Sequence, residues 1–88
     1  MNKEKYEENA EKTYTGLRAI LMEFSNKDLL TDFAFRYGYW RPYLSNIANG
    51  YIRPDGYAVK GSYPQNLLIL KDAKAFQKKI EKSFDKSV

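Results

Sequence analysis

Two glycines constrain the fold of this chain more than any other feature, because each ends a short apolar stripe with helical spacing. The stripe before Gly38 consists of Leu29, Leu30, Phe33, Ala34 and Tyr37. A second stripe, over about Arg41 to Ala48, ends at Asn49-Gly50 and holds Pro42 in its first turn, where proline costs no hydrogen bond. Glycine readily adopts the left-handed backbone that commonly ends a helix. The sequence therefore predicts two short helices joined at Gly38-Tyr39-Trp40, which is the pattern of a helix-turn-helix.

Longer helices are predicted on both sides of this pair. Residues 3–24 carry a stripe at positions i, i+3, i+4 and i+7, formed by Leu17, Ile20, Leu21 and Phe24. Ser25-Asn26 is expected to end that helix, and Ser25 with Asp28 forms a variant capping box for the next one. A last amphipathic helix is predicted with Asp72 as its N-cap, and its apolar stripe consists of Ala73, Phe76, Ile80 and Phe84.

The segment between the second short helix and the last helix is predicted to be β-structure. Residues 53–56, Arg-Pro-Asp-Gly, form a strong turn signal. Tyr57–Val59 and Leu67–Leu70 are predicted as strands of a hairpin within residues 57–70, although the continuous run Leu67–Leu70 also fits the start of a helix. We expect a mainly α fold in a single domain over residues 1–88. Its helix-turn-helix core covers 27–54, and a small C-terminal β-hairpin (wing) and a final amphipathic helix cover 55–88.

Composition excludes several kinds of site. The 88 residues include no Cys and no His, which removes disulfides, thiol nucleophiles and the usual general base at neutral pH. Asp28 and Asp32 share a helix face, but carboxylates are common near a helix start, and no third ligand or glycine-rich phosphate loop accompanies them. We therefore expect no enzyme, no cofactor and no metal site. No apolar run reaches the ~18 residues of a membrane-spanning helix and no signal-peptide pattern opens the chain, so a cytoplasmic protein without membrane contact is expected.

Charge and aromatic residues gather in the middle of the chain. The formal net charge is +4, which favours a polyanionic partner. From Arg36 to Tyr63 there are four cations and one carboxylate, together with Trp40 and most of the tyrosines. Arginine and tyrosine side chains both suit a phosphate backbone. The same aromatic rings also suit a core or a protein interface.

Residues 27–54 resemble the phage repressor and Cro (XRE-type) helix-turn-helix family. The positions in register, without a gap, are Phe33-Ala34, Gly38, Tyr43-Leu44-Ser45, Ile47, Asn49-Gly50 and Pro54. One departure is Trp40, because the family usually has Ser or Thr at the cap of its recognition helix. A second departure follows Pro54, where the family continues into further helices and this chain predicts a hairpin.

The resemblance implies that the helix beginning at Arg41 lies in the major groove, with its N-terminal residues on base edges. Arg41 is then expected to pair with guanine and Asn46 with adenine. The residues implied to bind DNA are Lys27, Arg41, Pro42, Ser45, Asn46, Asn49, Tyr51, Arg53 and Lys60. Those outside the helix, and Asn49 at its end, are expected on the sugar-phosphate backbone, with Lys60 at the tip of the wing.

These observations predict a small protein that binds double-stranded DNA, either as a phage or mobile-element transcriptional regulator or as an excisionase-like accessory factor. A homodimer is expected, joined through the N-terminal helix or through Phe76, Ile80 and Phe84. The alternative is a protein-interaction module, such as a phage-type inhibitor or a replication adaptor. It would reuse the helix-turn-helix skeleton through an aromatic patch of Tyr39, Trp40 and Tyr43.

Overall fold

Four α-helices make up the described part of the chain. The computed structural model describes residues 3–50, 54–56 and 62–86, with the backbone alone for 82–86. The helices are α1 (Lys3–Asn26), α2 (Leu30–Tyr37), α3 (Arg41–Asn49) and α4 (Tyr63–Lys86). None of the residues in these described ranges lies in a β-strand. The prediction of a mainly α chain is confirmed, as are the two short helices on either side of Gly38.

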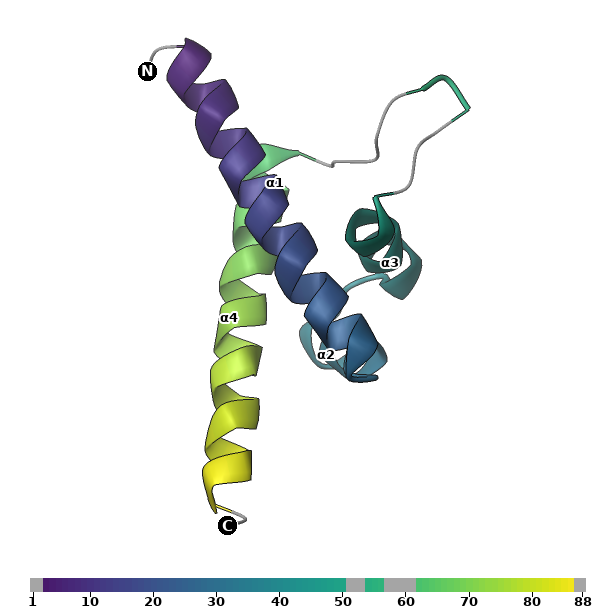
Figure 1. Ribbon diagram of the computed structural model, residues 1–88, viewed down its shortest axis with the longest axis vertical. Helices are drawn as coiled ribbons and strands as arrows, with labels where there is room; N and C mark the ends of the chain where they lie inside the picture. Colours follow the sequence, from purple (N-terminus) through teal and green to yellow (C-terminus); the bar gives the residue numbers. More distant parts are fainter. Residues whose placement is uncertain (1–2, 51–53, 57–61, 87–88) are drawn as a thin grey trace.

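α1 is the central helix of the fold. It packs against α3 along one side and against α4 along another, and α2 lies near its C-terminal end (Figure 1). In the described parts of α3 and α4, no Cα atom of one helix lies within 8 Å of a Cα atom of the other. α3 and the long C-terminal helix α4 are therefore held on different sides of α1.

One apolar core joins all four helices, and Phe33 of α2 lies at its centre. The largest fully buried side chains are Leu17, Leu21, Phe24, Phe33, Leu44, Ile47 and Ile69. The centroid of the Phe33 ring lies 5.4 Å from that of Phe24 in α1 and 5.4 Å from that of Phe76 in α4. A helix as short as α2 is marginal by itself in water, so this burial is what holds it in place.

The capping box predicted for Ser25 and Asp28 at the start of α2 is wrong, because the turn between α1 and α2 has a different structure. Asp28 adopts the left-handed conformation, with φ of 59°. The Leu29 amide donates to the Phe24 carbonyl at 2.7 Å and the Asp28 amide donates to the Ser25 carbonyl at 3.2 Å. These two bonds are those of a Schellman motif, so Ser25 and Asp28 end α1 instead of capping α2. The N-cap of α2 is Leu29, without a side-chain hydrogen bond.

The turn between α2 and α3 follows the prediction. Gly38 is left-handed, with φ of 73°, and the Tyr39 amide donates to the Ala34 carbonyl at 2.8 Å. Trp40 has an extended backbone and is the N-cap of α3, where it offers no side-chain hydrogen bond. Because Gly38 ends α2 and Pro42 lies in the first turn of α3, the chain changes direction sharply and sets the two helices against each other.

The predicted C-terminal hairpin is wrong. Its second strand, Leu67–Leu70, lies inside α4 and so cannot pair with a strand, while Tyr57–Val59 lies outside the described residues. Ile69 is fully buried, whereas Leu67 and Leu68 are exposed, which is the pattern of one helix face and not of a buried strand. Leucine is also a strong helix former. The described chain therefore has no wing.

The start of α4 also differs from the prediction, because Asp72 lies in the middle of the helix and not at its N-cap. The Gln65 amide donates to Ser62 Oγ at 3.4 Å. Ser-x-x-Gln is the sequence of a capping box, and Pro64 is tolerated in the first helical turn. Of the predicted stripe, Ala73 and Phe76 are buried and Ile80 packs against the core, whereas the Phe84 side chain lies outside the description. Because Phe76 is in the core, it cannot supply the expected homodimer contact.

Candidate nucleic-acid interface

α3 divides its residues between the core and the outside. Leu44, Ile47 and Ala48 are buried. The α3 residues predicted for DNA contact are not buried: Arg41, Pro42 and Asn49 are exposed, and Ser45 and Asn46 are half-buried. Positions 42, 45, 46 and 49 are spaced i, i+3, i+4 and i+7, so they lie along one stripe. The structure therefore places four of the five α3 residues that the sequence predicted for DNA contact along one stripe, whereas Arg41 lies at the edge of α3 and borders a small cavity with Asp28 of the α1–α2 turn. We call these five residues the α3 outer face.

Hydrogen-bonding groups dominate the α3 outer face. Asn49 Nδ2 donates to Ser45 Oγ at 3.2 Å, so these two side chains already contact each other. Within the described chain, the Asn46 side chain makes no hydrogen bond and Arg41 makes no ion pair. α3 contains no Asp or Glu. The surface thus offers a guanidinium and two amides without a carboxylate of the same helix to repel phosphate.

The remaining predicted DNA contacts are not part of this surface. Lys27 lies in the turn after α1 and pairs with Glu23, with 2.8 Å between Lys27 Nζ and Glu23 Oε1. That hydrogen bond and the charge of Lys27 lower the pKa of Glu23. Tyr51, Arg53 and Lys60 lie outside the described residues.

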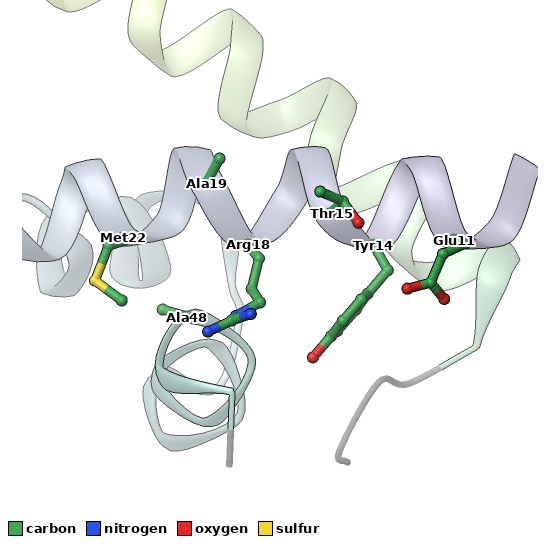
Figure 2. Close-up of a pocket in the computed structure, with 7 residues that line it drawn as sticks. All are labelled: Glu11, Tyr14, Thr15, Arg18, Ala19, Met22 and Ala48. Carbon is green, nitrogen blue, oxygen red and sulfur yellow. The ribbon is translucent and has the colours of Figure 1, made fainter.

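Arg18 is a cation beside α3 that the sequence did not indicate. A Cβ atom at position 50 would lie 2.7 Å from Arg18 Nη2, so glycine at this position lets the guanidinium approach the end of α3. A cation at a helix C-terminus is favoured by the helix dipole. The side chain points from α1 toward α3 (Figure 2). It borders a cavity of about 360 Å³ lined by Glu11, Tyr14, Thr15, Arg18, Ala19, Met22 and Ala48.

Only part of the proposed aromatic patch of Tyr39, Trp40 and Tyr43 is exposed. Tyr39 and Tyr43 are partly buried and pack against the core, and burial raises the pKa of Tyr43. Trp40 is 73% exposed, and Phe35 of α2, which the sequence did not single out, is 87% exposed. An aromatic docking surface in the described chain would therefore have to rest on Phe35 and Trp40.

Tyr39 links the helix-turn-helix to α4. Its hydroxyl donates to Asp72 Oδ2 at 2.5 Å, and its ring lies 5.7 Å from that of Phe33. Burial, followed by the bond to the Asp72 carboxylate and its charge, raises the pKa of Tyr39 well above the usual value for tyrosine. This contact is a structural one, which fixes the turn before α3 against the C-terminal helix.

We expect the stability of the protein to fall as the pH rises above about 10, with Tyr39 as a main cause. The unfolded chain releases the tyrosine proton near pH 10, whereas the folded protein holds it more tightly, so the stabilisation is present below that pH and is lost above it. Tyr39→Phe should lower the free energy of unfolding at pH 7 by about 1 kcal/mol. Between pH 9 and 11, the melting temperature of the Tyr39→Phe variant should then fall less than that of the wild type. Equal drops in the two proteins would contradict this role of Tyr39.

Comparisons with known proteins identify no relative: no family model, no curated protein and no solved structure matches the chain. None of the described helices has the length and apolarity needed to cross a membrane. Among the same residues, no three metal-ligating side chains come together.

Proposed function

We propose that this chain is a DNA-binding protein that inserts α3 into the major groove of double-stranded DNA. The observation that carries the proposal is the exposure of the α3 outer face. Its polar side chains point away from the core, and within the described residues α4 packs against α1 without covering it. A helix held on a body in this way can enter the groove, which is wide enough to admit it.

The residue types on this face support base recognition. Arg41 can donate two hydrogen bonds to one guanine, and Asn46 can exchange two with one adenine. Both lie in the first two turns of α3, where helix-turn-helix proteins contact bases. Arg18 lies at the other end of α3 and can add a phosphate contact. The resemblance of residues 27–54 to the phage repressor and Cro family supports the same orientation.

Between the two uses of DNA binding, we propose transcriptional regulation. A hairpin before the last helix would favour an excisionase-like factor, but Leu67–Leu70 is helical. A circular-permutation assay separates the two uses, since a recombination accessory factor would bend the bound site strongly.

The rival function, a protein-interaction module, is supported by the exposure of Phe35 and Trp40. Large exposed aromatic side chains are typical anchors of protein interfaces. The effect of Phe35→Ala on the affinity for DNA tests the choice between the two functions. If α3 binds in the groove, this variant should bind DNA with an affinity within about twofold of the wild type, because Phe35 is on α2 and outside the α3 outer face.

Binding of the purified protein to a labelled random duplex, followed by fluorescence anisotropy at rising salt, tests the proposal. Each phosphate contact contributes about −0.9 to the slope of log K against log salt. Four contacts would therefore reduce the affinity roughly 150-fold between 50 and 200 mM salt. No binding at 50 mM salt, or an affinity that salt leaves unchanged, would contradict the proposal.

A further inference from the structure

α4 presents a strongly basic surface that the proposed function does not use. Between Tyr63 and Lys86 there are six lysines and three carboxylates. The exposed lysines whose side chains are described are Lys71, Lys74, Lys78 and Lys79. The first three are spaced i, i+3 and i+7 and lie along one stripe of the helix, with the fourth beside them. We call these four residues the α4 lysine face.

The charges of the α4 lysine face form no ion pair within the described chain, in contrast to three cations elsewhere. Three cations in the first half of the chain each pair with a carboxylate four residues earlier. The pairs are Glu8–Lys12 in α1, Glu23–Lys27 at its end and Asp32–Arg36 in α2. Among the residues whose side chains are described, no lysine of α4 forms such a pair. The two carboxylates of α4 whose side chains are described are Asp72, which accepts the bond from Tyr39, and Glu81, and neither forms an ion pair with these lysines. Like charges three or four residues apart on a helix destabilise it, so an anionic partner would relieve a repulsion that the free protein retains.

The position of this surface separates it from α3. α3 and α4 pack on different sides of α1 (Figure 1), and within the described chain no Cα atom of one lies within 8 Å of a Cα atom of the other. The α4 lysine face therefore belongs to a different helix from the α3 outer face, and the two surfaces are offered separately to anionic partners.

We propose that the α4 lysine face binds the phosphate backbone of a second duplex segment, so that one protein molecule bridges two segments of DNA. This inference rests on the proposed function of α3. Lysine is a compact charge on a flexible stem, which suits contact with phosphates without reading bases. Bridging by this face is therefore independent of sequence, while α3 selects the site.

The chemistry of α4 favours nucleic acid over a membrane surface. A helix that lies in a lipid interface needs a free apolar face opposite its lysines. In α4 that opposite face, with Ile69, Ala73 and Phe76, is buried in the core. Among the α4 residues whose side chains are described, the exposed large apolar ones are Leu67 and Leu68, close to its N-terminal end.

A bridging assay with two variants of equal charge tests the proposal. One variant carries Lys71→Gln, Lys74→Gln and Lys78→Gln, and the control carries Lys3→Gln, Lys5→Gln and Lys12→Gln on the exposed part of α1. Energy transfer between a donor-labelled and an acceptor-labelled duplex, with less than one protein per duplex, reports bridging at 50 mM salt. Circular dichroism checks that each variant is folded, and sedimentation checks that it has the same association state as the wild type.

We expect the wild type and the control to bridge and the α4 variant to lose at least ten-fold in bridging while it still binds a single duplex. Equal bridging by all three proteins, or an equal loss in both variants, would overturn the proposal. Single-duplex binding without bridging by the wild type would overturn it and leave the function of α3 intact. No duplex binding at all would instead overturn the proposed function. The last arm uses vesicles of phosphatidylserine and phosphatidylcholine. If the wild type and the control bind these vesicles but do not bridge duplexes, and the α4 variant does not bind the vesicles, the face is assigned to lipid and the proposal is overturned.

Discussion

Phe33→Ala is expected to lower the free energy of unfolding by about 3–5 kcal/mol, which is the usual cost of deleting a buried aromatic ring. The Phe33 side chain is fully buried, and its ring contacts aromatic rings of α1 and α4. The change would leave a cavity where three helices meet, bordered by the rings of Phe24, Tyr37 and Phe76. The free energy of unfolding of a typical domain is only about 5–15 kcal/mol. For a wild type at the low end of that range, a large fraction of the variant molecules would be unfolded at 37 °C.

Urea denaturation followed by circular dichroism measures this effect, and Phe35→Ala is the matched control. The control removes the same ring from the same helix, but Phe35 is 87% exposed, so its free energy of unfolding should change by no more than about 0.5 kcal/mol. Equal losses in the two variants would show that the orientation of α2 described above is wrong.

Arg41→Ala is expected to weaken binding to a selected DNA site by about 5- to 150-fold, which corresponds to about 1–3 kcal/mol for one bidentate contact with guanine. Arg41 lies at the N-terminus of α3 and is exposed without an ion pair in the described chain. Its removal should also relax the preference for guanine at one position of the site. Competition between the selected duplex and single-base variants measures both effects.

Arg36→Ala is the control for this experiment, because it removes the same charge from the neighbouring helix. Arg36 is exposed and pairs with Asp32, with 2.8 Å between Arg36 Nε and Asp32 Oδ1. Its replacement should change the affinity less than about threefold and leave the base preference unchanged, since a distant exposed charge acts mainly through salt-dependent attraction. The same loss in both variants would indicate a general charge effect and would contradict base recognition by Arg41.

The helix-turn-helix could be predicted from sequence because its signals are local. Gly38 and Gly50 each adopt the left-handed conformation that ends a helix, and Pro42 lies in the first turn of α3. The i, i+3, i+4 pattern of the short stripes then decides which residues of α3 face outward. For the same reason, four of the five predicted contacts on α3 lie along one stripe.

The C-terminal half was predicted less well, because its signals are ambiguous or non-local. A continuous run such as Leu67–Leu70 fits a buried strand and a helix equally, and only the Ser62-to-Gln65 capping box with Pro64 distinguishes them. The hydrogen bond of Tyr39 with Asp72 and the approach of Arg18 to Gly50 join residues that are more than 30 positions apart. Contacts of this kind depend on how the helices pack around α1 and leave no pattern in the sequence.

The most direct measurement of the central claim is an NMR titration of ¹⁵N-labelled protein with one equivalent of a short duplex selected for tight binding. If α3 enters the major groove, the largest shifts should fall on the backbone amides of Arg41–Asn49 and on the side-chain amides of Asn46 and Asn49. Signals of the buried half of α4, such as Ala73 and Phe76, should move little. Saturable binding with unshifted α3 signals, or with the largest shifts around Phe35, would contradict recognition of DNA by this helix.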